Sequence, residues 1–191
     1  MSLLMISSLI VAFHSNALQQ ASPVQPQSTD NGQAVIAATK TTDKEFIRLR
    51  ETFDRLSRAI NRQGGMKPSD RATIETLCEK TRQFNEAHPN YQAGLAQEIQ
   101  LSLWLGKNTR VNELTEKLWR TAPDNRKLGD YWLEMNKKNG SSDDVLDTYE
   151  KLNTAYPADP QLRKQWIEYG YKLGDKNQIN EILNRLMATE A

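Results

Sequence analysis

Two residue types in this chain recur with a single period. Three prolines stand 34 residues apart, and a glycine follows each of them after 17 residues: Pro89 and Gly106, Pro123 and Gly140, Pro157 and Gly174. A period of about 20–50 residues is typical of repeat proteins, and about 34 is the length of one helix–turn–helix unit. Such arrays stack their hairpins and present extended surfaces. The period therefore predicts an all-α solenoid, and it favours binding over catalysis.

Composition excludes several classes of protein. The 191 residues carry 25 basic and 24 acidic side chains, a formal net charge of +1, so we expect no global attraction to nucleic acid or anionic lipid. The single cysteine, Cys78, excludes an internal disulfide framework and a cysteine-based zinc cluster. Because it falls in an apolar helical stripe, Cys78 is interpreted as a small buried hydrophobe rather than a reactive thiol.

The front of the chain has the features of an export signal. Residues 3–13 are mostly apolar, a length that suits a signal peptide and is well short of the ~20 residues of a transmembrane span. Ser15 and Ala17 fit a cleavage site before Leu18. No basic residue precedes the apolar run, since the first lysine is Lys40. We therefore predict a signal peptide over residues 1–17 and an extracytoplasmic, for example periplasmic, location. An uncleaved membrane tether and an apolar N-terminus on a cytoplasmic protein remain as alternatives.

Residues 18–42 are rich in Gln, Ser, Thr, Ala and Pro and show no apolar period, which predicts a disordered linker. A helical stripe then begins at Asp43 and runs to Asn61, and the Gly64-Gly65 pair ends it. Pro68-Ser69-Asp70 starts the next helix. The apolar stripes of these two helices are Phe46, Leu49, Phe53, Leu56 and Ile60, followed by Ile74, Leu77, Cys78 and Phe84.

The later units repeat their apolar positions as well as their turns. Aligned positions agree across units: Trp132 with Trp166, Leu133 with Ile167, Val111 with Val145 and Ile179, and Leu118 with Leu152 and Leu186. Helical spacing favours core packing for Trp132 and Trp166, whereas Trp104, if exposed, is a candidate binding anchor. We expect each repeat glycine to take the positive φ of a helix C-cap, and Ser141 to cap the helix that follows it.

With these features the chain resembles the tetratricopeptide repeat (TPR) family, which has the same proline and mid-unit glycine. The resemblance implies a right-handed α–α superhelix of about four helical hairpins over residues 43–191, with units at about 43–89, 90–123, 124–157 and 158–191. Two family positions for small residues hold Leu133 and Val145 and their equivalents here, so we expect looser packing between paired helices. Trp132 and Trp166 are also similar to the half-a-tetratricopeptide variety of RNA-processing scaffolds.

The resemblance further implies a peptide-binding concave groove built from the first helix of each unit. Its candidate residues are Gln100, Trp104, Lys127, Asp130, Glu134, Lys138, Lys164, Glu168 and Tyr171. A groove that is apolar at one end and charged at the other suits a peptide with an apolar anchor and polar flanks. The lysine and asparagine set with which some relatives clamp a C-terminal carboxylate is not matched, since Glu134 and Glu168 stand at positions that need a neutral amide.

Signals for catalysis are absent from the sequence. The two histidines, His14 and His88, are isolated, and Gly64-Gly65 lacks the lysine of a phosphate-binding loop. We therefore expect no cofactor, metal or nucleic acid, and interpret the chain as a non-enzymatic scaffold that binds a peptide or protein. An accessory domain or partner subunit of an enzyme, a cytoplasmic RNA-processing scaffold, and self-association through the C-terminal hairpin remain as alternatives, the last because no polar capping helix follows Met187.

Overall fold

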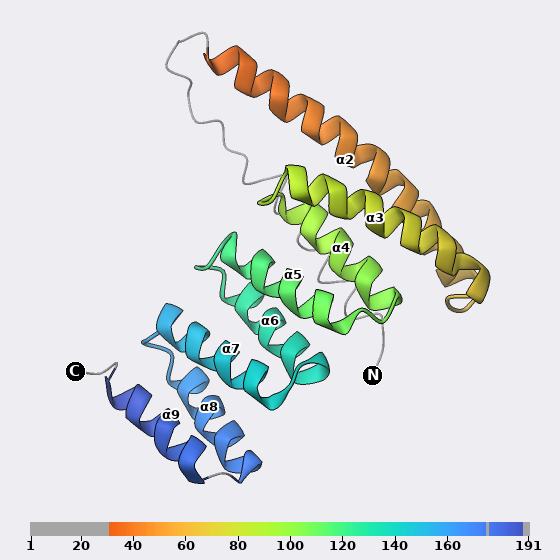
Figure 1. Cartoon of the computed structure of the whole chain (residues 1–191). Coiled ribbons are helices and arrows are strands. Elements are labelled where there is room, and N and C mark those ends of the chain that lie inside the picture. Colours follow the sequence, from red (N-terminus) through yellow and green to blue (C-terminus); the bar gives the residue numbers. More distant parts are fainter. Residues whose placement is uncertain (1–30, 175, 189–191) are drawn as a thin grey trace. The chain divides into compact units, whose positions relative to one another are not determined.

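The computed structural model describes residues 31–174 and 176–188 (Figure 1). Within these residues the chain is all-α, as predicted, with eight α-helices, one 3-10 helix and no strand. The elements are α2 (Asn31–Arg62), η1 (Pro68–Asp70), α3 (Arg71–Ala87), α4 (Gln92–Trp104), α5 (Asn108–Arg120), α6 (Arg126–Asn139), α7 (Ser142–Ala155), α8 (Pro160–Leu173) and α9 (Lys176–Ala188).

The first helix begins earlier than the sequence predicts. α2 starts at Asn31 instead of Asp43, so residues 31–42, assigned above to a disordered linker, are helical. The segment lacks an apolar period, but it contains three alanines and a glutamine and no proline, and such residues favour a helix once one is nucleated downstream. The signal peptide over residues 1–17 and the rest of the linker lie outside the described residues.

The chain divides into two compact units, Met1–Leu105 and Gly106–Ala191. The boundary between the two compact units falls between α4 and α5, within the predicted repeat unit 90–123. α4 packs against α3 and α2. At Gly94 the approach of α3 is so close that a Cβ atom would lie 2.2 Å from Asn85 Oδ1. This contact explains why α4 associates with the helix before it.

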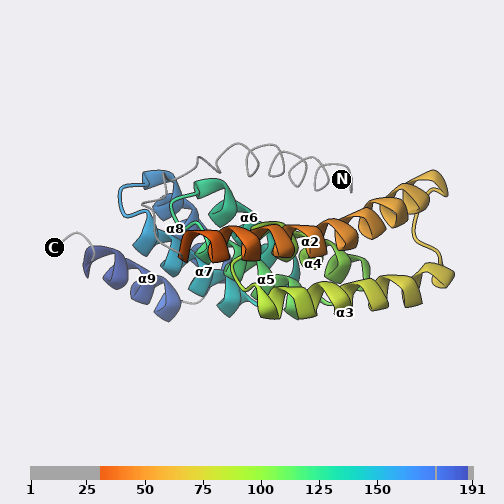
Figure 2. The same cartoon turned by 90° about the horizontal axis from the view of Figure 1, so that it is seen from above.

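The first unit is built on the apolar stripes that the sequence predicts. α2 and α3 pack against each other and are joined by a turn in which Gly64 and Gly65 have positive φ (Figures 1 and 2). Cys78 is buried in the core, which confirms its interpretation as a small hydrophobe. The core cluster comprises Phe53, Ile60, Ile74, Leu77, Cys78, Leu101 and Leu105.

The repeat prolines lie in turns and do not begin helices. Each comes two or three residues after a helix ends, at Ala87, Arg120 and Ala155, and a proline cannot continue the helix before it. Two of the repeat glycines, Gly106 and Gly174, have φ of +69° and +74°, as predicted.

The prediction of a positive φ is wrong for the third repeat glycine, Gly140. It has φ −92° and ψ 172°, and its amide donates to Asn136 O at 2.8 Å. A Cβ atom there would lie 2.9 Å from the same carbonyl oxygen, so close backbone packing explains this glycine. Ser141 then caps α7 as predicted, since its hydroxyl accepts from the amide of Asp144 at 3.2 Å.

The second unit contains α5 to α9, and its core confirms the predicted repeat positions. Trp132 and Trp166 are 1% and 2% exposed, and the equivalent Val111 and Val145 are also buried. Two glycines allow close approach between the paired helices of this unit. A Cβ atom at Gly129 would lie 2.8 Å from Leu152 on α7, and one at Gly170 would lie 2.7 Å from Ile182 on α9.

Candidate binding surfaces

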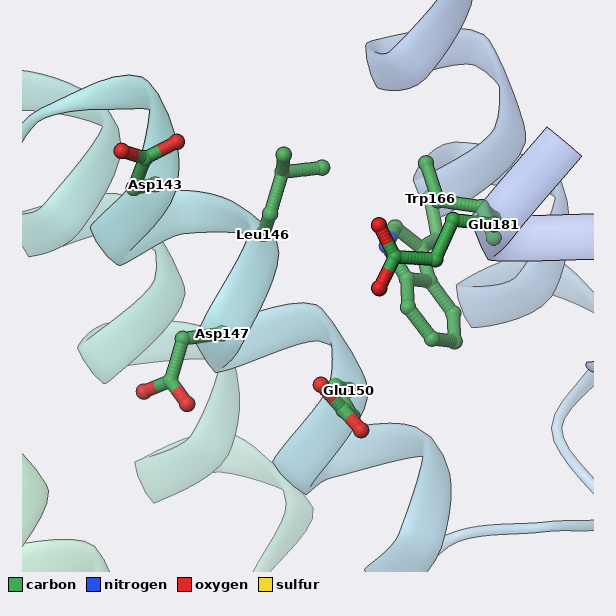
Figure 3. Close-up of a pocket in the computed structure, with 7 residues that line it drawn as sticks. Asp143, Leu146, Asp147, Glu150, Trp166 and Glu181 are labelled. Carbon is green, nitrogen blue, oxygen red and sulfur yellow. The ribbon is translucent and has the colours of Figure 1, made fainter. Parts of the chain in front are cut away.

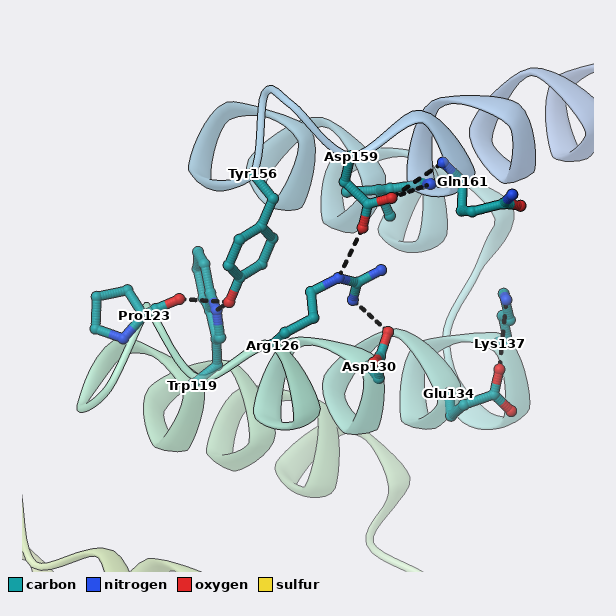
Figure 4. A network of polar contacts seen from close by, with 10 residues as sticks. Trp119, Pro123, Arg126, Asp130, Glu134, Lys137, Tyr156, Asp159 and Gln161 are labelled. Atoms are coloured by element: carbon teal, nitrogen blue, oxygen red, sulfur yellow. Dashed lines mark hydrogen bonds and ion pairs between the residues drawn. The ribbon is translucent and has the colours of Figure 1, made fainter.

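The predicted groove residues of the second unit are exposed on α6 and α8. On α6, Asp130 pairs with Arg126, and Glu134 lies 3.3 Å from Lys137 (Figure 4). On α8, Lys164 and Glu168 are 3.9 Å apart, and Tyr171 is 61% exposed. Lys127 and Lys138 complete this set, which we call the α6–α8 residues. Their carboxylates pair with neighbours on the same helix, as is usual for a solvated helix surface.

The two predicted groove residues of the first unit are less accessible. Gln100 is buried, with 8% of its surface exposed, which differs from the accessible position that the family resemblance implies. Trp104 is half-buried and stacks on Phe53 of α2, with ring centroids 5.3 Å apart and planes inclined by 9°. Trp104 therefore contributes to the packing of α4 on α2, so it is not the free aromatic anchor expected of an exposed tryptophan.

A polar network joins two successive interhelical turns of the second unit (Figure 4). The hydroxyl of Tyr156 donates to Pro123 O and accepts from Trp119 Nε1 at 3.2 Å. The guanidinium of Arg126 lies over the Tyr156 ring, 5.3 Å from its centroid, and contacts Asp159 at 3.1 Å. These contacts join residues 30 to 37 positions apart, about one repeat, so the network fixes one hairpin on the next.

A groove of about 270 Å³ lies among α7, α8 and α9, and we call it the α7–α9 groove. Figure 3 shows its α7 residues on one side and Trp166 with Glu181 on the other. Three of the lining residues are apolar and four are carboxylates: Leu146, Trp166 and Ile182, and Asp143, Asp147, Glu150 and Glu181. Among its described lining residues there is no lysine, arginine or histidine.

A second groove, of about 210 Å³, lies among α5, α6 and α7 and is called the α5–α7 groove. Its lining includes Thr109, Asn112, Glu113, Glu116, Trp132 and Asp147. Adding one repeat of 34 residues to each of these gives Asp143, Leu146, Asp147, Glu150, Trp166 and Glu181, all of which line the α7–α9 groove. The two grooves are therefore successive copies of one feature of the repeat.

The α5–α7 groove holds a cation from the chain itself. The ammonium of Lys151 lies 3.0 Å from Glu116 and 2.8 Å from Asp147, and 5.7 Å from the centroid of the Trp132 ring. Burial opposes ionisation of Glu116, but hydrogen bonds from Arg120 and Lys151 outweigh it and lower the pKa of that carboxyl. Burial likewise disfavours the charged form of Lys151, yet its bonds to Asp147 and Glu116 raise the pKa of its ammonium.

Sequence reasoning missed both grooves and Tyr156. A signal for the grooves was present, because Glu113, Asp147 and Glu181 keep the period of 34 in step with Trp132 and Trp166. Carboxylates at helical spacing are ordinarily solvated, so the period alone did not mark them as a site. In the part of the chain that the structure describes, no His, Cys, Asp and Glu side chains are grouped to hold a metal ion.

Comparisons with known proteins add little to this description. No protein-family model matches the chain, and no curated protein sequence matches it. One solved structure, described as "MamA RS-1 ArsTM double mutant", is 11% identical, with a TM-score of 0.41. That match covers 97% of this chain and 94% of the other chain. None of the helices in residues 31–174 and 176–188 is long and apolar enough to cross a membrane.

Proposed function

We propose that the chain is a non-enzymatic protein-interaction module of the tetratricopeptide repeat type, which binds a peptide or a segment of a partner protein. The observation that carries the proposal is the recurrence of one groove, with the same tryptophan and carboxylate positions, in successive repeats of the second unit. Repeats of this kind form binding surfaces by placing equivalent side chains side by side. A right-handed superhelix of such repeats is part of the proposal.

Two surfaces of the second unit are candidates for holding the segment. The α6–α8 residues, with the exposed ring of Tyr171, are the surface that the family resemblance implies. The α7–α9 groove is the other, and it combines an apolar floor with charged residues at its sides. Small apolar pockets with a few polar groups are the usual anchor sites for peptide side chains.

We also propose that the module acts outside the cytoplasm. The support is the apolar run at residues 3–13 with the small residues Ser15 and Ala17 after it, the pattern of a cleaved signal peptide.

The binding proposal is tested by selecting random peptides from a display library on the folded full-length chain. Enriched peptides are then synthesised and measured by fluorescence anisotropy. We expect enrichment of a related set of sequences and saturable binding with one peptide per chain. A selection that enriches nothing over a heat-unfolded sample of the chain would contradict the proposed function.

A further inference from the structure

We infer that one side of α2 binds the anionic surface of a lipid membrane through a row of basic side chains. The inference goes beyond the proposed function and does not depend on it, because the peptide-binding surfaces belong to the second unit and α2 belongs to the first. The formal net charge of the whole chain is +1, so the attraction comes from the placement of charges on this helix.

The basic residues of α2 gather on one side of the helix. Positions three, four and seven residues apart lie on the same side of an α-helix. Five basic residues with these spacings form what we call the basic stripe: Lys44, Arg48, Arg55, Arg58 and Arg62. All five are exposed, whereas Phe46, Phe53 and Ile60 on the opposite side of the helix are buried. The stripe is about 27 Å long, and packing within the first unit leaves it open.

The cations of the stripe lack the ion pairs that arginines of α3, α5 and α6 form. Five arginines on those helices lie within 3.1 Å of a carboxylate oxygen: Arg71, Arg82, Arg110, Arg120 and Arg126. In the stripe, Arg55, Arg58 and Arg62 donate instead to main-chain oxygens of the preceding turn, at 3.1–3.4 Å. Within residues 31–174 and 176–188, no carboxylate forms an ion pair with a residue of the stripe.

The spacing of the stripe adds repulsion between its own members. Lys44 and Arg48 stand four residues apart, as do Arg58 and Arg62, and like charges at this spacing repel each other. On this side of residues 44–62 the carboxylate is Glu51, against five cations. An anionic partner relieves the repulsion and supplies the missing counter-charges, so the stripe gains electrostatic free energy when it binds one.

Two exposed apolar side chains favour a membrane over other polyanions. Ile47, next to Arg48 on α2, is 52% exposed, and Met66, four residues after Arg62 in the turn that follows, is 43% exposed. Apolar side chains enter the boundary between lipid headgroups and acyl chains, whereas the phosphates and sugars of a nucleic acid backbone offer them no such contact. A membrane also presents phosphates across a plane, so all five cations contact it together.

Co-sedimentation of the full chain with lipid vesicles measures this binding. One set of vesicles is phosphatidylcholine alone, and the other contains about 30% phosphatidylglycerol, which supplies a negative surface potential. We expect the anionic vesicles to be bound at least about tenfold more tightly than the neutral ones. Most of this binding should be lost as salt is raised from about 0.1 M to about 0.5 M, because salt screens the surface charge.

Variants then locate the site. Arg55→Gln combined with Arg58→Gln is expected to weaken binding by at least about fivefold, since each basic residue at an anionic surface contributes about that factor. Arg55→Lys combined with Arg58→Lys keeps the charge and should keep most of the binding. Lys107→Gln combined with Lys172→Gln removes the same charge from exposed positions of the second unit and should leave binding unchanged. Ile47→Gln keeps the charge and should weaken binding by about twofold or more. Glutamine and lysine favour helices, and circular dichroism checks that each variant is folded.

Several results would overturn the inference. Equal binding to neutral and anionic vesicles would show attachment by other means, for example through the apolar run at residues 3–13, which every variant retains. Equal weakening by the two glutamine pairs would show general attraction without a site. If the vesicles are not bound but an RNA or DNA duplex is, and Arg55→Gln with Arg58→Gln abolishes that binding, the stripe is a nucleic-acid surface. None of these results bears on peptide binding by the second unit, so the proposed function stands or falls separately.

Discussion

The contacts of Tyr156 between successive turns of the second unit predict how much stability the substitution Tyr156→Phe removes. It removes a hydroxyl and keeps the ring that lies beneath the Arg126 guanidinium. Two hydrogen bonds are lost, one to Pro123 O and one from Trp119 Nε1. The Trp119 side chain is buried, with 7% of its surface exposed.

The magnitude follows from these two bonds. Each contributes about 0.5–1.5 kcal/mol net, and a buried donor left without an acceptor costs about 1–3 kcal/mol. Tyr156 itself is half-buried, so water replaces part of what is lost. We therefore expect the free energy of unfolding of the second unit to fall by about 2 kcal/mol.

Urea unfolding of the full chain, followed by tryptophan fluorescence and circular dichroism, measures this change. The matched control is Tyr171→Phe, the same substitution at a side chain that is 61% exposed, for which we expect a change within about 0.5 kcal/mol. A double-mutant cycle with Trp119→Phe should show a coupling of at least about 0.5 kcal/mol. Equal effects of the two tyrosine substitutions, or additive effects in the cycle, would refute the claim that this network fixes one hairpin on the next.

Three further predictions follow from single features of the chain. Ser141→Ala removes the cap of α7 and is expected to destabilise the second unit by about 1 kcal/mol in urea unfolding, whereas Ser141→Thr, which keeps the hydroxyl, should restore most of the loss; a neutral Ser141→Ala would contradict the cap. The pKa values of Glu116, Asp144 and Asp159 are lowered in the folded chain, so their stabilisation is complete above the unfolded pKa values of about 4 and is lost as pH falls through the lower folded values. Melting temperature measured against pH should therefore decline below about pH 5, and a flat profile down to pH 3 would count against these contacts. Intact mass and fractionation of the protein from its native host should show a chain that begins at Leu18 outside the cytoplasm, and an uncleaved cytoplasmic chain would refute the export proposal.

The repeat period and the core could be predicted because they depend on local patterns. Pro123 and Gly174 mark the ends of helices because of their own backbone conformations. Trp132 and Trp166 lie on apolar helical stripes, and a residue on such a stripe is buried whichever helix covers it. Such signals are carried by a few neighbouring residues, so one sequence is enough to read them.

The features that the sequence did not predict depend on which helices meet. The close approach of α3 to α4 at Gly94 is a contact between two helices, and the spacing of residues within one helix does not predict it. A side chain at position 140 would clash with the carbonyl oxygen of Asn136, and this contact explains the glycine, whose φ is negative. By its sequence pattern Asp147 is an ordinary helix-surface carboxylate. Only the packing of α5 and α9 beside α7 shows that it lines both the α5–α7 groove and the α7–α9 groove.

The proposed binding of a peptide by the repeated grooves of the second unit is tested most directly by the four tryptophan indole N–H signals in a nitrogen-15 NMR spectrum of the full chain. The signals are assigned with single Trp→Phe variants, and a peptide enriched in the display selection is then titrated into the unmodified protein. The account predicts that the signal of Trp132 or of Trp166, the tryptophans that line the two grooves, moves saturably with the peptide concentration. Saturable peptide binding that moves neither signal would contradict the account.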